Sequence, residues 1–110
     1  MEFIAIAKNL RFSPYKMRML ADVVRGKDVQ QALYWLATCR MKRALPIKKV
    51  IESAAANAKD RSNLNLQELL IKEIKVDQGP MFKYFKPGAM GRANVQRKRL
   101  SHISVKVASK

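Results

Sequence analysis

The residues best suited to chemistry lie together near the C-terminal end, between Gly79 and Arg99. This stretch contains no carboxylate, and aromatic residues separate its first cations. Its positively charged residues are Lys83, Lys86, Arg92, Arg97, Lys98 and Arg99, and its aromatic residues are Phe82, Tyr84 and Phe85. Because cations attract phosphates and planar rings stack on bases, this composition favours a nucleic-acid partner.

The centre of the same stretch, Pro87–Gly91, is rich in turn residues. Proline fixes φ and glycine permits positive φ, so we expect a turn with an extended segment on either side. The pattern therefore predicts a long β-hairpin over residues 79–99, with arms that project roughly 30 Å at ~3.3 Å per residue. A two-stranded ribbon is only marginally stable alone in water, so this hairpin needs a partner.

Residues that could support catalysis or metal binding are few. His102 is the single histidine, and the alternation around it places it on the outer face of a strand. Cys39 has no His or Cys partner in the sequence around it, so neither metal ligation nor nucleophilic catalysis is indicated. The glycines match no phosphate-binding loop. We therefore predict that the chain is not an enzyme and has no metal site, no cofactor and no small-molecule substrate.

The composition points to one domain, residues 1–110, with a polyanionic partner. The net charge is +15, and residues 78–110 carry 8 Lys or Arg without any acid, whereas residues 1–77 carry 15 against 8 Asp or Glu. Hydrophobic residues make up 48% of the chain, which favours folding over disorder. The single cysteine is typical of a reducing, intracellular setting. No signal segment or membrane-spanning run is visible, so a cytoplasmic location is expected.

Three helices are expected in the first half of the chain. Ser13 and Pro14 have the types that begin a helix, and Gly26 has the type that ends one. Asp28 is expected to cap a second helix, with Trp35 as a packing residue at its margin. The apolar stripes of these two helices consist of Met17, Leu20, Ala21 and Val24, and of Val29, Ala32, Leu33 and Leu36. A third helix is expected over residues 41–59, where Pro46 should bend the first turns, followed by a polar turn over residues 60–65.

Strands are expected over residues 3–7, 69–76 and 103–107. The apolar phase slips within the second of these, which indicates either a bulge or a strand that is covered on both sides. Because the hairpin joins the last two strands, they should be antiparallel. The fold class expected is α+β, with three helices packed on a small antiparallel three-stranded sheet in the order β-α-α-α-β-β and a long protruding β-hairpin.

Five segments of the chain also carry a family resemblance. They read Ser-Pro-Tyr-Lys-Met-Arg at 13–18, Ser-Ala-Ala-Ala-Asn-Ala at 53–58, Val-Asp-Gln-Gly-Pro at 76–80, Gly-Arg-Ala at 91–93 and Lys-Arg-Leu-Ser-His-Ile at 98–103. Together, in this order and spacing, they resemble the family of the bacterial large-subunit ribosomal protein twenty-two, and the resemblance covers nearly the whole chain.

The resemblance implies a structural protein of the large ribosomal subunit. In that family the body lies near the outer end of the nascent-peptide tunnel, and the hairpin runs inward through ribosomal RNA. Its contacts reach several rRNA domains, so the protein acts as an assembly clamp. The tip forms the narrow part of the tunnel together with ribosomal protein four and meets the transient nascent peptide.

The resemblance also implies site residues. The hairpin cations become rRNA contacts, the body contacts are Lys16, Arg18, Arg25 and Lys27, and the tunnel-facing tip is Gly88, Ala89, Met90 and Gly91. The chain departs from the family pattern where Tyr84, Gly88 and Met90 replace three habitual cations. Tyr84 is suited to stack on a base there, in place of an arginine that pairs with a phosphate. Pro46 also departs from the uninterrupted third helix of the family.

Two other classes of function are open on the residues alone. One is a free-standing regulator that binds nucleic acid with a β-ribbon. The other is a cationic protein of the membrane surface, which is disfavoured because the basic stretch lacks the period of an amphipathic helix.

Overall fold

The computed structural model describes the backbone of residues 2–87, 91 and 93–109, and the side chains of the same ranges except 81–87 and 93–98. The elements in chain order are β1 (Glu2–Leu10), α1 (Pro14–Val24), α2 (Val29–Thr38), α3 (Ala44–Ser62), the short 3-10 helix η1 (Leu66–Glu68), β2 (Leu69–Pro87) and β3 (Ala93–Ser109). This order confirms the expected α+β class, and η1 is an addition to it.

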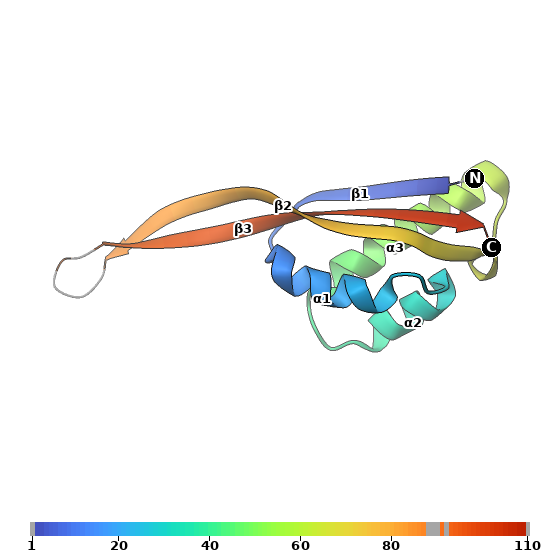
Figure 1. Cartoon of the computed structure of the whole chain (residues 1–110), viewed down its shortest axis with the longest axis horizontal. Coiled ribbons are helices and arrows are strands. Elements are labelled where there is room, and N and C mark those ends of the chain that lie inside the picture. The colour runs from blue at the N-terminus through green and yellow to red at the C-terminus, as the bar shows by residue number, and fades with distance from the viewer. Residues whose placement is uncertain (1, 88–90, 92, 110) are drawn as a thin grey trace.

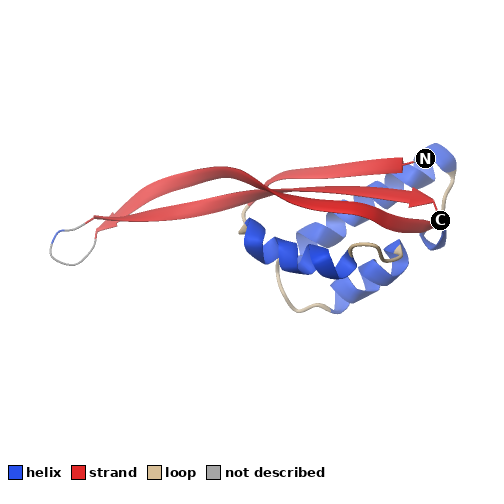
Figure 2. Ribbon diagram, viewed as in Figure 1, coloured by secondary structure: helices blue, strands red, loops and turns tan. Residues whose placement is uncertain are grey.

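The three strands form one antiparallel sheet in the order β1-β3-β2. The helices cover one face at one end of the sheet, and beyond the end of β1 only β2 and β3 continue, as a two-stranded ribbon that extends away from the helices (Figures 1 and 2). The molecule is therefore elongated, with extents of 62 × 25 × 17 Å. In the text below, the ribbon means residues 81–87 and 93–99, and the body means the rest of the described chain.

The helix boundaries follow local signals in the sequence. Ser13 occupies the N-cap of α1 with Pro14 directly after it, as expected. Gly26 follows the end of α1 with φ of +80°, a left-handed conformation that glycine adopts without a steric penalty. In α2, Asp28 stands at the N-cap, and Trp35 is partly buried at the margin of the core.

The expected bounds of the third helix were wrong at both ends. It begins at Ala44 rather than near residue 41, so Pro46 lies in the first turn. An N–H in that turn has no partner within the helix, so Pro46 removes no hydrogen bond from α3. The helix also runs on to Ser62, into the segment expected to be a polar turn, and ends where Asn63 adopts a left-handed φ of 52°.

The core lies between the helices and the inner face of the sheet. Alternate residues of β3, among them Ile103 and Val105, are fully buried there, together with Ile51 of α3 and Met17 of α1. At ~25 cal/mol per Å² of buried apolar area, this contiguous cluster is the main favourable term for folding. The body therefore has a core of its own and needs nothing from the ribbon.

Three β-bulges interrupt the register of the sheet. The first leaves Lys72 without a partner on β3, between the pairs Ile71–Val107 and Glu73–Lys106. This is the bulge that the phase slip in the sequence allowed, and the alternative of a strand covered on both sides is excluded because Lys72 and Lys75 are exposed. The other two bulges lie side by side at the base of the ribbon.

At the base of the ribbon, two edge strands bulge against the same residue of β3. Residues 79–80 of β2 oppose Leu100 alone, and residues 8–9 of β1 oppose His102 alone. Asn9 adopts a positive φ of 60°, and its N–H donates to Nδ1 of His102 at 3.1 Å. Since bulges bend strands and increase their twist, this pair marks the place where the ribbon leaves the body.

Candidate nucleic-acid interface

The ribbon brings its cations into register with one another. Lys83 lies opposite Arg97, Phe82 opposite Lys98, and Tyr84 opposite Gln96. Like charges at directly opposite positions of an antiparallel pair destabilise it. The Lys83–Arg97 pair therefore disfavours the free ribbon and favours one that has bound an anion.

The remaining predicted ribbon residues divide by what is described. Lys86 lies opposite Asn94 near the end of the ribbon, and Gly91 has φ of +76°, which confirms the expectation that glycine supplies positive φ in the turn. The predictions for Gly88, Ala89, Met90 and Arg92 lie outside the described residues. The tip that the resemblance implied stays a prediction for that reason.

Two of the four predicted body contacts hold the edge of the sheet. The Nε of Arg18 donates to the carbonyl oxygen of Val76 at 3.1 Å, and Nη2 of Arg25 donates to that of Ile74 at 2.9 Å. These carbonyls belong to the outer edge of β2, which would otherwise present unpaired backbone groups to another strand. Both arginines thus have a structural role, whether or not they also bind RNA.

The charges on α1 differ between its two ends. Near the C-terminal end, Arg25 forms an ion pair with Asp22 at 2.5 Å, which offsets its charge. Near the N-terminal end, Lys16 and Arg18 are exposed, and neither forms an ion pair with any described residue. Lys27 is exposed beyond the C-terminal end, about 16 Å along an 11-residue helix. The four predicted body contacts therefore do not form one cluster.

Arg18 is instead brought close to the ribbon, at a corner where α1 meets the base of β3. The Cζ of Arg18 lies 5.6 Å from the centroid of the Tyr15 ring, and the Cζ of Arg99 lies 5.8 Å from it. Both distances are within the range of a cation–π interaction. Tyr15 was not among the predicted site residues, although its i, i+3 spacing to Arg18 on a helix was a visible signal.

The outer face of the sheet has the opposite electrostatic character, because its lysines are paired with carboxylates. Lys72 is hydrogen-bonded to Glu2 across the sheet, and Glu73 accepts from Lys75 at 2.8 Å and lies 3.5 Å from Lys106. The hydrogen bond from Lys72 holds the pKa of Glu2 below its ordinary value, and that from Lys75 does the same to the pKa of Glu73. This face therefore offers a polyanion little unpaired positive charge.

Among the described residues, the side chains suited to catalysis are dispersed. Nδ1 of His102 accepts the Asn9 N–H, and Cys39 is a partly buried free thiol at the end of α2. No three of the described His, Cys, Asp or Glu residues are grouped as metal ligands. Within the described chain, no helix combines the length and the apolar character needed to cross a membrane.

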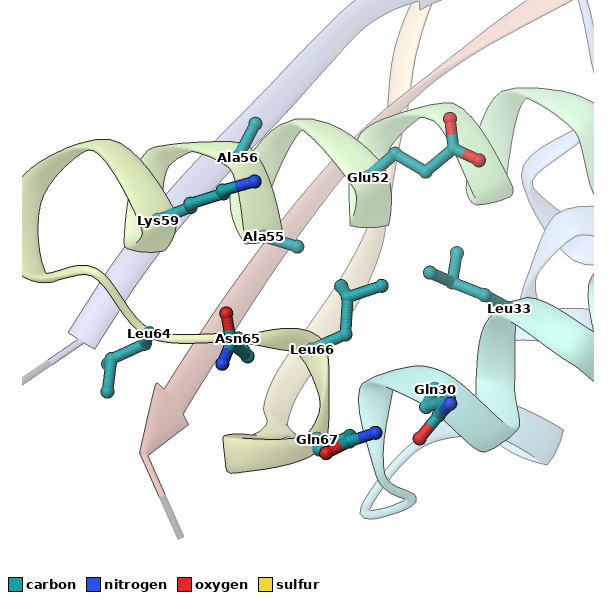
Figure 3. A pocket seen from close by; sticks show the side chains of 10 residues that line it. All are labelled: Gln30, Leu33, Glu52, Ala55, Ala56, Lys59, Leu64, Asn65, Leu66 and Gln67. Atoms are coloured by element: carbon teal, nitrogen blue, oxygen red, sulfur yellow. The ribbon is translucent and has the colours of Figure 1, made fainter.

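Two cavities open on the body, both with largely apolar walls. One, of 570 Å³, lies between α2, α3 and the segment before β2, and Leu33, Ala55 and Leu66 form part of its lining (Figure 3). The other, of 370 Å³, lies between β1 and the start of α3 and is lined by Ile6, Leu45 and Pro46 among others. Neither cavity brings together a nucleophile and a base among its lining residues.

A compact body with a protruding cationic ribbon, and with its cations gathered at the ribbon and its base, defines a small nucleic-acid-binding protein of the kind that inserts an extension into folded RNA. Residues 5–108 match the family described as Ribosomal protein L22p/L17e. The chain therefore belongs to this family of ribosomal proteins, and the resemblance read from the five segments is confirmed.

Individual relatives agree along the full length. The Large ribosomal subunit protein uL22 of Desulforamulus reducens is 47% identical over 110 residues, which are 100% of this chain and 97% of the relative. That of Bdellovibrio bacteriovorus is 46% identical over 110 residues and 100% of both chains. The Large ribosomal subunit protein uL22c of Chlorokybus atmophyticus is 46% identical over 103 residues, which are 94% of this chain and 87% of the relative.

Proposed function

We propose that this chain is a non-catalytic structural constituent of the large ribosomal subunit, which binds rRNA through its ribbon and the base of that ribbon. The observation that carries the proposal is the register of the ribbon, in which Lys83 faces Arg97 and Phe82 faces Lys98. Opposed cations on a strand pair without helices over it are unfavourable alone and favourable between phosphates.

The shape of the molecule supports the same proposal. Folded RNA contains narrow crevices lined by phosphates, and a two-stranded ribbon can enter one that a globular body cannot. Shape and phosphate geometry are sufficient for recognition of this kind, and no readout of base edges is required. The body then remains outside the crevice, with its lysines on the outer sheet face already paired to Glu2 and Glu73.

The finer part of the proposal follows from the family. Contacts of the ribbon with several rRNA domains clamp these domains during assembly in the cytoplasm. The tip, including Gly88, Ala89, Met90 and Gly91, lines the nascent-peptide exit tunnel beside ribosomal protein four and meets the nascent peptide. Tyr84 stacks on a base, and Lys86 and Arg92 contact phosphates between it and the tip.

The test is the position of the chain in a sucrose gradient of lysate from cells in which a tagged copy is expressed. The full chain should sediment with large subunits, and a variant in which residues 81–98 are replaced by a short turn should be depleted from them. Sedimentation of the full chain only at the top of the gradient would contradict the proposal. Full incorporation of the shortened variant would contradict the role of the ribbon.

A further inference from the structure

The corner where α1 meets the ribbon is a cationic site that spans two elements distant in the sequence. Tyr15 lies on α1 and is 62% exposed. The guanidinium of Arg18 approaches its ring from the next turn of the same helix, and the guanidinium of Arg99 approaches it from β3 at the base of the ribbon. Each contact alone is an ordinary surface feature, whereas their convergence on one ring is not.

The ring and the sheet edge hold Arg18 in a fixed position. Its Nε donates to the carbonyl of Val76, and the ring packs against the guanidinium carbon, so the planar fork is fixed while its terminal nitrogens form no hydrogen bond with the described residues. Arginine forks bind phosphate oxygens in bidentate geometry, and little freedom is lost on binding when the fork is already ordered.

The charge at this corner calls for an anion. Neither Arg18 nor Arg99 forms an ion pair with a described carboxylate, in contrast to Arg25, which is paired with Asp22 on the same helix. Two like charges held near one ring repel each other. A phosphate bound between them removes this cost, and the exposure of Tyr15 leaves the site open to solvent.

We propose that Tyr15, Arg18 and Arg99 form a phosphodiester-binding clamp at the base of the ribbon, in which the two arginines bind an RNA phosphate and Tyr15 is the positioning residue that orders both. The proposal rests on the proposed function, since it names how rRNA is held at one place. It adds a consequence for geometry. Because Arg99 belongs to β3 and Tyr15 to α1, a phosphate bound here fixes the direction of the ribbon relative to the body.

The test compares four variants of the full chain for affinity to a large-subunit rRNA transcript over a range of salt concentrations. Tyr15→Leu removes the ring, Tyr15→Phe keeps it, Arg18→Lys removes the fork, and Tyr34→Leu is the control. Tyr34 is 65% exposed on α2 and has its hydroxyl near Gln30, with no described arginine over its ring, so it matches Tyr15 in all but the clamp. Thermal unfolding confirms that each variant is folded.

We expect Tyr15→Leu and Arg18→Lys to weaken binding about fivefold to tenfold, the range for a lost hydrogen bond to a charged group. The slope of log affinity against log salt should fall by roughly 0.7 to 0.9 for the one phosphate released. Tyr15→Phe and Tyr34→Leu should bind as the parent does.

Parental affinity and slope in Tyr15→Leu, or equal losses in Tyr15→Leu and Tyr34→Leu, would overturn the clamp while leaving rRNA binding by the chain intact. Loss in Tyr15→Phe equal to that in Tyr15→Leu would overturn the role of the ring. If the parent chain itself does not bind rRNA, the proposed function fails instead.

Discussion

The same two strands, β2 and β3, pass through both the body and the ribbon, and they do different work in each. In the body, Ile74 and Ile103 are 1% and 0% exposed beneath the helices. In the ribbon, Lys83 and Arg97 occupy opposite positions, and the helices lie elsewhere (Figure 1). Strand pairing alone is marginally stable, so the difference teaches that the body contains the folding energy and the ribbon contains the binding energy.

The boundary between the two regions is built into the backbone. The bulges at residues 8–9 and 79–80 flank His102 on β3, and Gly79 leaves room for the His102 ring and the Leu100 carbonyl. A change in the body should therefore affect stability without affecting contacts to RNA, and a change in the ribbon should do the reverse.

The largest effect on stability is expected from a core truncation. Ile103→Ala in the body removes a fully buried side chain and should cost about 3 kcal/mol of the free energy of unfolding, through lost burial and a cavity. Val95→Ala on the ribbon strand is the matched change, and it should cost less than about 0.5 kcal/mol. Urea unfolding measures both, and equal losses would show that the ribbon is part of the folding unit.

The second prediction removes three charges from each region in turn. Replacing Arg97, Lys98 and Arg99 by Ala should lower rRNA affinity about tenfold to a hundredfold at low salt and flatten the salt dependence, because phosphate contacts are lost. Replacing Lys72, Lys75 and Lys106 by Ala removes the same charge from the paired outer face of the sheet, and it should leave affinity nearly unchanged.

Filter binding over a salt series measures both triple variants. Melting temperatures should stay close to the parent for the ribbon variant, because exposed charges add little to stability. If the two triple variants lose affinity equally, binding depends on net charge alone, and the distinction between the ribbon and the outer sheet face is lost.

The third prediction concerns the boundary itself. A Cβ at Gly79 would lie 3.1 Å from the His102 Cε1 and 3.1 Å from the Leu100 carbonyl oxygen, so Gly79→Ala should cost about 1 kcal/mol through the shift it forces. Adding His102→Ala should recover part of that loss, which a double-mutant cycle by chemical denaturation measures. Independent, additive losses would mean that the imidazole does not limit the space at this site.

The smallest effect is expected from acidification of the outer sheet face. Hydrogen bonds from Lys72 and Lys75 lower the pKa values of Glu2 and Glu73 in the folded chain. The stability they contribute is therefore present above the ordinary glutamate pKa of about 4.3 and is lost as the pH falls through the lower folded values. The double variant Glu2→Gln, Glu73→Gln should show a flatter dependence of the melting temperature on pH in that window, and an unchanged slope would contradict the assignment.

Local signals in the sequence were sufficient for most of the fold. Ser13 and Gly26 mark the ends of the first helix because capping and positive φ are properties of single residues. The bulge in β2 was visible as a slip in apolar phase. Pro46 was misleading because a proline is compatible with the first turn of a helix, and the sequence does not show which residue begins that turn.

The candidate site was only partly predictable. The cations of the ribbon stand out by their density, but their opposite positions depend on the register, which the bulge at residues 79–80 sets. The approach of Arg99 to Tyr15 depends on the packing of α1 against β2 and β3, and no spacing in the chain encodes it. For the same reason, the bonds from Arg18 and Arg25 to the edge of β2 could not be anticipated.

Amide hydrogen exchange, measured on the free chain and on its complex with large-subunit rRNA, tests most directly whether the ribbon is stabilised by RNA rather than by the body. We predict that amides at positions 82–86 and 94–98 exchange far faster than that of Val105 in the free chain and become protected in the complex, while Val105 is protected in both. Ribbon amides as protected as Val105 without RNA, or equally unprotected with it, would contradict the account.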